Sequence, residues 1–451
     1  MNEISDKRWF RVGVGVLTAV FFLWLLAPQG DPATAAHAQK RIPVYYWHMW
    51  SAEWLPVMNG VVDAFNKSQT KYEVIPLQVP YGDGNSKFLL SVAGGDPPDV
   101  MAQWDQAIST WAQAGVLEPL DTRMTPEEKT NFLTKTYPVI HHNGWYKGHL
   151  YGMVMGVDVY ACYYRTGDFK TAGLDPAHFP TSLEELTADG FKMNRYDSAG
   201  NLTHIGFVPQ LLTNFAPSFG GGFYDDKTGQ VLLDSPQNLR ALTYVVDTES
   251  KFGIDKVQRF SAGLKSQNGA DWPFIDGAYS VALDGEWRVK QIAQFAPNLD
   301  YGVAPLPPPS GGKALASYSV TNFLTIPAGA KHPEGAWEFI KFWAGLDDPA
   351  RAAAFNVAFG WLPSSPAMAA SPAYQAYLRQ YPKYRTFVEL AGSNNLVTTP
   401  PVPYQLFLND QIGSEDDLAE RGLVSPQQAL AGLVQNVDRE RRQRKELGYD
   451  Q

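Results

Sequence analysis

Cysteine is almost absent from the sequence, since Cys162 is the only one in 451 residues. A single thiol excludes an internal disulfide, a metal site made of several cysteines and a dithiol redox pair. Cys162 lies in the alternating apolar run VYACYYR, where a free cysteine usually behaves as a small buried hydrophobe. We therefore predict a buried, unreactive thiol at this position and not a catalytic one.

Basic side chains are fewer than acidic ones. The chain has 37 Lys and Arg against 46 Asp and Glu, which gives a formal net charge of −9. An acidic balance argues against nucleic acid as a partner and against a polybasic contact with a membrane surface. Hydrophobic residues make up 45% and charged residues 18% of the chain, as is usual for globular proteins. A length of 451 residues exceeds one ordinary core and predicts two domains.

The familiar motifs of catalysis are missing. The chain has no G-x-S-x-G, no H-E-x-x-H and no Walker loop. The nearest glycine run, Gly220–Phe223, lacks the lysine of a phosphate loop, so we expect a turn. His141 and His142 are adjacent, and adjacent side chains point to different sides of a strand or helix, which argues against a metal site. We therefore expect no enzyme activity, no metal and no cofactor.

Long apolar runs are also scarce, and the one that is present lies near the N-terminus. Lys7, Arg8 and Arg11 precede the uncharged run Val12–Ala27, and an A-x-A pattern ends at Ala38. This order is typical of a secretory signal peptide, here cleaved near Ala38. The run is short for a membrane-spanning helix, although an uncleaved N-terminal anchor is the alternative. No cysteine lies near the cleavage site, so we expect a periplasmic protein that is not a lipoprotein.

Aromatic residues are abundant by contrast. They make up 13% of the chain, with 13 Trp and 22 Tyr, and both side chains join an apolar ring to a polar group, which suits wet binding surfaces. The densest cluster is YYWHMWSAEW, Tyr45–Trp54, between a strand-like run and a helix-like one. We expect Trp47, inside the strand, to belong to the core, and Trp50, beyond the strand, to face a cleft.

The hydrophobic patterns alternate between strands and helices. We expect strands at IPVYYW, KYEVIPLQVP and PPDVMAQW, and helices at LPVMNGVVDAFNKS, SKFLLSVAGG and AISTWAQAGV. Such alternation predicts an α/β fold with a mostly parallel sheet. Ser182 is expected to open a helix over SLEELTADGFKM, and residues 301–327 to form two strands joined by a hairpin-like Pro/Gly loop.

Several motifs stand in a specific order. They are VYYWHMWSAEWLPVMNGVVDAFN, GGDPPDVMAQWDQAISTWAQAGVLEPLD, KGHLYGMVMGVDVYACYYRTGDF, SFGGGFYDD, AYSVALDGEW and FGWLPSSPA. This order, from Val44 to about Leu433, resembles that of the extracellular solute-binding proteins, family 1, of ABC importers, the group that contains the maltose-binding proteins. The resemblance implies the two-lobed periplasmic binding protein fold of type II, in which each lobe is a mostly parallel sheet flanked by helices and the ligand lies in the cleft between the lobes.

The same resemblance implies how the chain is divided, with two passes through each lobe. The expected segments are 1–38 for the signal peptide, 39–157 for the first part of the N-lobe, 158–302 for the first part of the C-lobe, 303–346 for the return to the N-lobe and 347–451 for the second part of the C-lobe.

Loops that follow strands are the first place to look for binding residues, because ligands of open α/β sheets lie beyond the carboxyl ends of the strands. Trp50 and Glu53 follow the first expected strand, and Tyr81 follows the second. Gln103 and Asp105 end the third, and their amide and carboxylate groups suit sugar hydroxyls. For Asp105 the alternative is a helix cap.

The resemblance also implies two binding residues, Asp158 and Trp287. The residues that match them in maltose-binding members of the family contact sugar, which implies sugar contact here. A carboxylate in an apolar strand needs a partner or water, so Asp158 is expected to face the cleft. For Trp287 the alternative is a ring that covers the core of a lobe. The other candidates are Tyr160, Glu286, Tyr318, Ser319, Asn322, Trp361 and Tyr404, together with Gly221 and Gly222 as backbone donors.

The predicted function is that of a substrate-binding receptor that captures a sugar or an oligosaccharide and delivers it to an ABC permease. We favour an oligosaccharide because the candidate aromatic residues are spread over several loops. A glycerol-3-phosphate or glycerophosphodiester ligand is the alternative within the family, since WHMWSAEW resembles the opening of that branch. From other classes, the alternatives are an exported glycoside hydrolase with Asp158 and Glu286 as its carboxylate pair, and a periplasmic sensor subunit. We expect a monomer whose partners are the carbohydrate and the permease subunits, with no nucleic acid.

Overall fold

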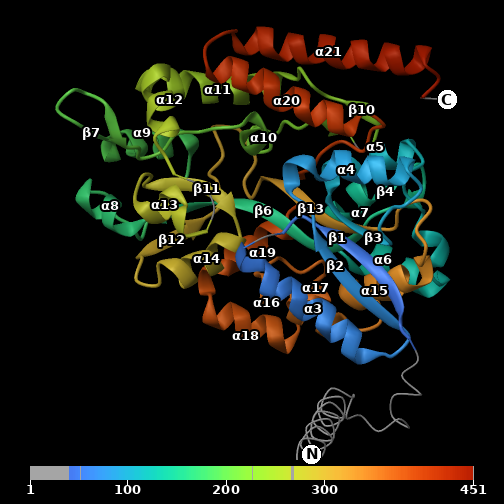
Figure 1. Ribbon diagram of the computed structural model, residues 1–451. Helices are drawn as coiled ribbons and strands as arrows, with labels where there is room; N and C mark the ends of the chain where they lie inside the picture. The colour runs from blue at the N-terminus through green and yellow to red at the C-terminus, as the bar shows by residue number, and fades with distance from the viewer. Residues whose placement is uncertain (1–39, 51, 226, 266–268, 450–451) are drawn as a thin grey trace, which may run out of the picture. The chain divides into compact units, whose positions relative to one another are not determined.

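The computed structural model describes residues 40–50, 52–225, 227–265 and 269–449. The expected signal peptide, residues 1–38, lies outside them. Residues Pro43–Gln451 form one compact unit, and the fold below is that of this unit (Figure 1).

The strands are short except for two. They are β1 (Ile42–His48), β2 (Tyr72–Gln78), β3 (Val100–Trp104), β4 (Trp145–Tyr146), β5 (His149–Leu150), β6 (Met153–Arg165), β7 (Arg195–Tyr196), β8 (Leu202–His204), β9 (Tyr224–Asp225), β10 (Gln230–Val231), β11 (Val281–Gly285), β12 (Tyr301–Ala304), β13 (Ser317–Thr325) and β14 (Leu396–Val397).

The helices fill most of the remaining chain. They are α3 (Leu55–Ser68), α4 (Tyr81–Ala93), α5 (Ile108–Gln113), α6 (Pro126–Lys135), α7 (Pro138–Gly144), α8 (Thr166–Thr171), α9 (Leu183–Met193), α10 (Leu212–Phe215), α11 (Pro236–Phe252), α12 (Ile254–Ala262), α13 (Pro273–Asp276), α14 (Trp287–Phe295), α15 (Pro333–Ala344), α16 (Pro349–Phe359), α17 (Pro366–Ala369), α18 (Pro372–Gln380), α19 (Arg385–Ala391), α20 (Gln405–Glu420) and α21 (Pro426–Glu446), with the 3-10 turns η1 (Ala52–Trp54), η2 (Asp105–Ala107), η3 (Asp121–Arg123), η4 (Gly269–Asp271) and η5 (Pro382–Tyr384).

One sheet connects the two lobes. Its order is β11-β6-β13-β3-β1-β2, with β12 also paired to β6 and β14 to β13. The strand β6 has 13 residues, and its first half pairs with β13 whereas its second half pairs with β11 and β12. We call the side of β1–β3 with α3, α4, α5 and α15 the N-lobe, and the side of β11 and β12 with α9, α11, α20 and α21 the C-lobe. The crossover predicted for this stretch is therefore the single long strand β6.

Two details of the sheet differ from the prediction. β1 and β3 are parallel as expected, but β6 is antiparallel to β11, β12 and β13. In addition, β12 and β13 do not form a hairpin, because they pair with opposite halves of β6. The hairpin is absent because the Pro/Gly loop leads from β12, on the C-lobe half of β6, to β13, on the N-lobe half.

The core of the N-lobe lies on one face of β1. Val44, Tyr46 and His48 are buried, whereas Tyr45 on the opposite face is 48% exposed. The hydroxyl of Tyr46 donates a hydrogen bond to the sulfur of Met58 in α3 at 3.4 Å, and its ring packs edge-on against two aromatic rings of α15. Trp47 lies on the other face and is only half-buried, so the prediction that it belongs to this core is wrong: the core uses the alternate residues.

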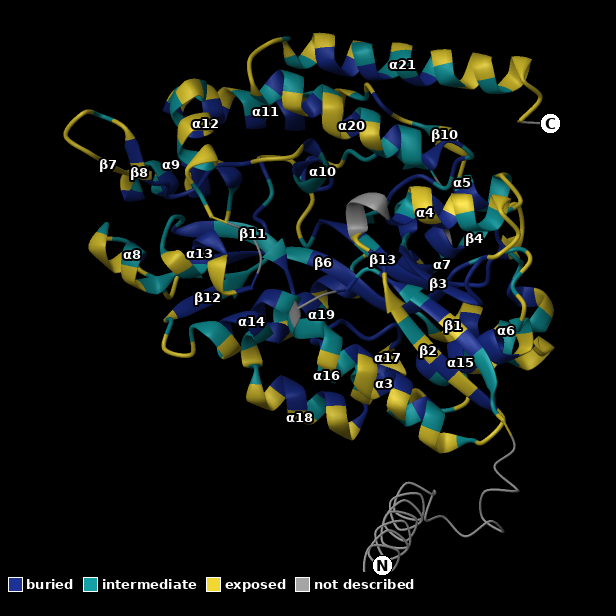
Figure 2. Ribbon diagram, viewed as in Figure 1, coloured by how far each residue is buried: buried dark blue, intermediate teal, exposed yellow. Residues whose placement is uncertain are grey.

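The core of the C-lobe contains a large hydrophobic cluster that includes Cys162 of β6 and packs α9, α11, α20 and α21 together. Cys162 is fully buried, as predicted, and burial raises the pKa of its thiol, which disfavours the reactive thiolate. Figure 2 shows β6 and β13 in the buried colour along most of their length, and α21 with its outer side exposed.

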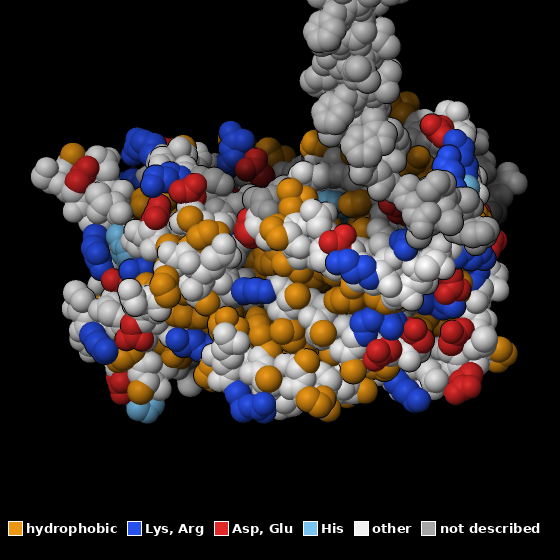
Figure 3. All heavy atoms as spheres, turned by 60° about the horizontal axis from the view of Figure 1, so that its bottom comes forward, with side chains coloured by type: hydrophobic (Ala, Val, Ile, Leu, Met, Phe, Trp, Pro, Cys, Tyr) orange, Lys and Arg blue, Asp and Glu red, His pale blue; other side chains and the backbone are white. Residues whose placement is uncertain are grey.

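Surface features are less distinctive. On the face drawn in Figure 3, acidic and basic side chains are interspersed around hydrophobic ones. None of the helices in the described ranges is both long and apolar enough to cross a membrane.

Candidate functional site

A pair of buried carboxyl groups lies where β6 passes between the lobes. Asp158 is 7% exposed and Glu286, just before α14, is fully buried. Asn322 of β13 donates a hydrogen bond from Nδ2 to Oδ2 of Asp158 at 2.9 Å, and the backbone amide of Val159 donates to Oε2 of Glu286 at 3.2 Å. The side chains of Asp158 and Glu286 also lie within hydrogen-bonding reach of each other.

This contact between Asp158 and Glu286 requires a proton, because two ionised carboxylates have no donor to share. Burial raises the pKa of Asp158 to about 6. Burial also raises the pKa of Glu286 well above its usual range, and the charge of Asp158 adds to that rise. The pair therefore holds a shared proton at neutral pH and can both donate and accept hydrogen bonds.

Asp105 is a third buried carboxyl group nearby, at the end of β3. It is 1% exposed, and Asn143 of α7 donates a hydrogen bond from Nδ2 to its Oδ2 at 2.5 Å. Burial raises the pKa of Asp105 to about 8, against hydrogen bonds from Asn143 and from the backbone of Thr321. Neither η2 nor α5 has a side-chain cap, so the role of Asp105 is to join β3, α7 and β13 rather than to cap a helix.

Tyr160 and Trp287 form an aromatic pair on the C-lobe side of this carboxyl pair. Their rings meet edge to face, with 6.1 Å between centroids, and both residues are half-buried. The Trp287 ring lies over Gly285, where a Cβ atom would come within 1.9 Å of the ring. A glycine is therefore required there, and it sets the position of the ring that the sequence singled out.

Trp50 and Trp361 form a second aromatic group. Their ring centroids are 5.4 Å apart, Trp361 stacks on Phe359 at 4.0 Å, and the Trp361 ring also covers Gly156 of β6. Both indoles are more than nine-tenths buried. This group joins the loop after β1 to the segment after α16, at the same strand that carries Asp158.

Glu53 links the lobes directly. Its Oε1 atom accepts a hydrogen bond from Nε2 of Gln291 in α14 at 2.7 Å. Gln291 in turn accepts a bond from Arg288, which pairs with Asp284 of β11 at 2.9 Å. The Glu53 carboxylate predicted to lie at the cleft is thus part of a hydrogen-bonded chain from η1 to the C-lobe.

The remaining predicted residues are placed as follows. Gln103 is buried and donates a hydrogen bond to Asn85 at 2.5 Å. The Tyr318 hydroxyl forms a hydrogen bond with the hydroxyl of Thr399 at 2.6 Å, whereas the buried hydroxyl of Ser319 has no partner in the described part of the chain.

Two further predicted residues lie at the starts of helices. Tyr404 is 5% exposed and precedes α20. Tyr81 begins α4, and its side chain lies outside the described detail.

Gly221 and Gly222 form a tight turn apart from this cluster. The Gly222 amide donates to Oδ1 of Asn238 at 2.9 Å, and the Gly221 amide donates to the carbonyl of Ala216 at 2.8 Å. Both backbone donors expected for a ligand are already bound within the protein, which supports a structural turn.

Some buried polar residues of this region were not among the predicted ones. In the described ranges, Nε2 of Gln405, Oγ1 of Thr321, Oγ of Ser109 and Nδ1 of His48 have no hydrogen-bond partner. Gln405 also accepts a bond from the backbone of Ser109 at 3.0 Å, which joins α20 to α5. Ser317, Ser319 and Thr321 alternate along β13, and Gln405 is the neighbour of Tyr404, so Thr321 and Gln405 were within reach of sequence reasoning.

Comparison with known proteins identifies the class to which this fold and site belong. Residues 51–347 match the model of the family described as bacterial extracellular solute-binding protein. This match covers more than half of the chain, and the chain is a member of that family, which consists of binding proteins.

Two curated relatives differ in what their names state. A maltotriose-binding protein of Pyrococcus abyssi is 25% identical over 306 residues, covering 66% of this chain and 62% of the relative. The chain thus spans less than two thirds of that protein. The sn-glycerol-3-phosphate-binding periplasmic protein UgpB of Yersinia enterocolitica is 22% identical over 435 residues, covering 90% of this chain and 94% of the relative.

Solved structures share the fold. CpMnBP1 with mannotriose bound is 26% identical and superimposes with a TM-score of 0.77, covering 88% of this chain and 100% of the other. The cyclic alpha-maltosyl-1,6-maltose binding protein of Arthrobacter globiformis is 21% identical with a TM-score of 0.70, covering 88% and 98%. The two-lobed solute-binding fold predicted from the sequence is confirmed, whereas the segment boundaries and the individual binding residues remain predictions.

Proposed function

We propose that this chain is the substrate-binding receptor of an ABC importer and that its ligand is a neutral oligosaccharide bound where β6 passes between the lobes. Membership of the solute-binding family supports the receptor role. The maltotriose-binding relative and the mannotriose complex support the ligand class.

The observation that carries the proposal is the meeting of polar and aromatic groups at this strand crossing. Three buried oxygen atoms there have no hydrogen-bond partner in the described ranges: Oδ1 of Asp105, Oδ1 of Asp158 and Oγ of Ser319. Tyr160 and Trp287 lie beside them. A sugar ring offers an apolar C–H face and a rim of hydroxyls. Aromatic planes with hydrogen-bonding neighbours are complementary to both.

Binding alone is sufficient for this role, so the proposal includes no catalysis and no cofactor. After export and cleavage near Ala38, the receptor would meet its sugar in the periplasm, close over it by a hinge-like motion, and present the closed form to the permease. An uncleaved anchor would leave the same two lobes at the membrane surface.

A glycerol-3-phosphate ligand is the second candidate, because a relative named for it aligns over 90% of this chain. The chemistry of the site disfavours it. A phosphate requires cationic or backbone donors, whereas Asp105, Asp158 and Glu286 are acids. The guanidinium of Arg288 is paired with Asp284 and stacked over Trp272 at 4.5 Å.

A thermal-shift screen tests the proposal. Maltotriose, mannotriose and glycerol-3-phosphate are each added to the purified mature chain, and a ligand at a hundredfold excess over its Kd should stabilise the fold by roughly 2.7 kcal/mol. We expect a shift with at least one oligosaccharide and none with the phosphate. Trp287→Ala should abolish most of that shift, whereas Tyr196→Ala, which removes a 48% exposed ring on β7, should leave it unchanged. A shift with glycerol-3-phosphate alone would reverse the assignment of the ligand.

A further inference from the structure

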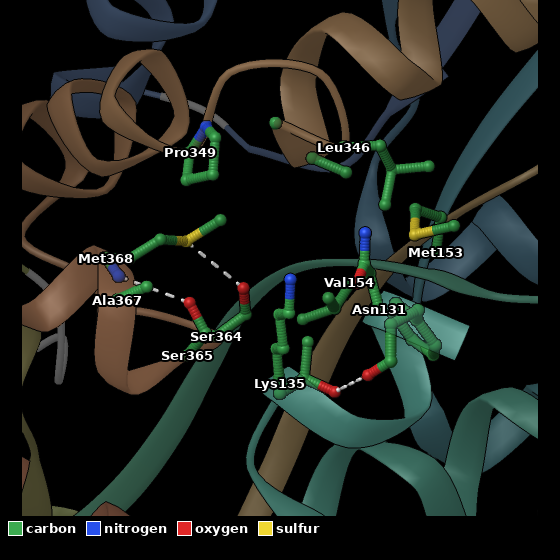
Figure 4. A pocket seen from close by; sticks show the side chains of 14 residues that line it. Asn131, Lys135, Met153, Val154, Leu346, Pro349, Ser364, Ser365, Ala367 and Met368 are labelled. Carbon is green, nitrogen blue, oxygen red and sulfur yellow. Dashed lines mark hydrogen bonds between the residues drawn. The ribbon is translucent and has the colours of Figure 1, made fainter. Parts of the chain in front are cut away.

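A cavity of about 140 Å3 lies beside α6 and α17, away from the residues described above. Four separate segments line it: the last turn of α6, the first residues of β6, the connection from α15 to α16, and α17 with the residues just before it. Figure 4 shows the side chains of these segments converging on one space.

Most of the wall is apolar. Met153 and Val154 form one side, Leu346 and Pro349 another, and Met368 of α17 closes the end (Figure 4). Met153, Val154 and Met368 are each more than nine-tenths buried. An engineered apolar cavity of about 150 Å3 in another protein binds benzene, so this space accommodates one ring or an alkyl chain of similar size.

The polar side of the cavity comes from one face of α6. Asn131 and Lys135 are four residues apart, so they lie one above the other on that helix. In Figure 4 the amide of Asn131 and the ammonium group of Lys135 both point into the space. Neither side chain has a hydrogen-bond or ion-pair partner in the part of the chain that the structure describes.

The charge of the lining has a single sign. Lys135 is the one charged residue among the lining residues, and none of them is acidic. The nearest carboxylates along the chain are those of Asp347 and Asp348, beside Pro349. Both are engaged by Arg351, at 2.5 and 3.7 Å, and Asp348 also caps α16.

We propose that this cavity is a second ligand site, separate from the one between the lobes, and that it takes a small monoanion with an apolar body of about six carbon atoms. The apolar body packs against Met153, Val154 and Met368. Lys135 binds the anionic group by a charge-assisted hydrogen bond, and the Asn131 amide donates a second one.

Benzoate and hexanoate are suitable probes, with benzyl alcohol and hexanol as neutral analogues of matching shape. Binding to the full mature chain is measured by ligand-observed NMR and calorimetry at millimolar concentrations. We expect both acids to bind at least about tenfold more tightly than the matching alcohols, because only the acids gain the bond to the ammonium group. Lys135→Gln should remove that tenfold advantage and leave the affinity for the alcohols unchanged.

Two further variants separate the site from general effects of charge. Lys251→Gln removes another exposed lysine, on α11, and should change nothing. Ala367→Trp places a ring at an exposed position of the lining and should abolish binding of acids and alcohols alike. Equal binding of acid and alcohol, an unchanged advantage in a folded Lys135→Gln protein, or no binding of either acid to the wild-type chain would each overturn the proposal. None of these outcomes depends on whether the chain binds sugar.

Discussion

At the scale of single residues, the shared proton of Asp158 and Glu286 has a consequence for stability. Burial raises the pKa of Asp158 from 3.8 to about 6 and raises that of Glu286 further. The folded chain therefore binds more protons than the unfolded chain between these values. The slope of the unfolding free energy with pH is proportional to the number of protons bound by the unfolded state minus the number bound by the folded state. The stability that the protonated pair contributes is therefore complete below pH 3.8 and is lost as the pH rises through about 6 and beyond.

Asp158→Asn should therefore stabilise the protein more at pH 8 than at pH 5. The amide keeps the shape of the side chain, accepts the bond from Asn322 and donates one to Glu286, so no buried charge has to form as the pH rises. We expect the melting temperature at pH 8 to rise by a few degrees relative to the wild type, with little change at pH 5, in circular dichroism melts at both pH values.

Asp63→Asn is the matched control for this prediction, because Asp63 is an exposed acid on α3. It should leave the pH dependence of the melting temperature as it is in the wild type. An Asp158→Asn protein whose melting temperature falls with pH as steeply as that of the wild type would contradict the shared proton.

At the scale of elements, the hydroxyl of Ser182 caps the N-terminus of α9. Ser182 accepts a hydrogen bond from the backbone amide of Glu185 at 3.1 Å, and Glu185 in turn accepts one from the amide of Thr181 at 2.8 Å. Ser182→Ala should lower the free energy of unfolding by about 1 kcal/mol, measured by urea denaturation. Ser198→Ala, in an exposed turn between β7 and β8, should have no comparable effect, and equal losses in the two variants would argue against the cap.

Elements of this local kind were predictable from the sequence. Ser182, the glycine that ends SKFLLSVAGG and the alternation at β1 are decided by neighbours in the chain, through capping, backbone freedom and side-chain period. The antiparallel pairing of β13 with β6 was not predictable, because it depends on which lobe the chain re-enters after the loop at 305–316. The hydrophobic pattern of a buried strand does not encode its partner.

The candidate site also contains some residues that were predictable from the sequence and others that were not. Asp158 and Trp287 were found because a carboxylate in an apolar strand and a tryptophan after a strand are visible in the sequence. The contact between Asp158 and Glu286 brings together residues that lie far apart in the chain. Asn143 and Gln405 are each one polar position among several in α7 and α20, so the sequence pattern does not single them out. Such positions become visible only when the hydrogen bonds of buried groups are counted.

At the scale of the whole molecule, the lobes are held together by more than the crossing strands. Gln291 of α14 donates to Glu53 of η1 at 2.7 Å, and the amide of Ser109 in α5 donates to Gln405 of α20 at 3.0 Å. Each bond joins a loop or helix that follows an N-lobe strand to a helix of the C-lobe. These bonds exist only when the lobes are close together, so they favour the closed arrangement over an open one.

Gln291→Ala should shift this equilibrium toward the open form. It removes one hydrogen bond to a carboxylate from the closed form alone, and such bonds contribute about 1.5 kcal/mol or more, which corresponds to roughly a tenfold change in the population. Without ligand, the radius of gyration from small-angle scattering should increase relative to the wild type, and the Kd for the sugar identified in the thermal screen should rise about tenfold. Gln380→Ala, an exposed position on α18, should change neither quantity. The scattering result does not depend on the identity of the ligand, so an unchanged radius of gyration in Gln291→Ala would show that this bond does not hold the lobes together, whatever sugar the protein binds.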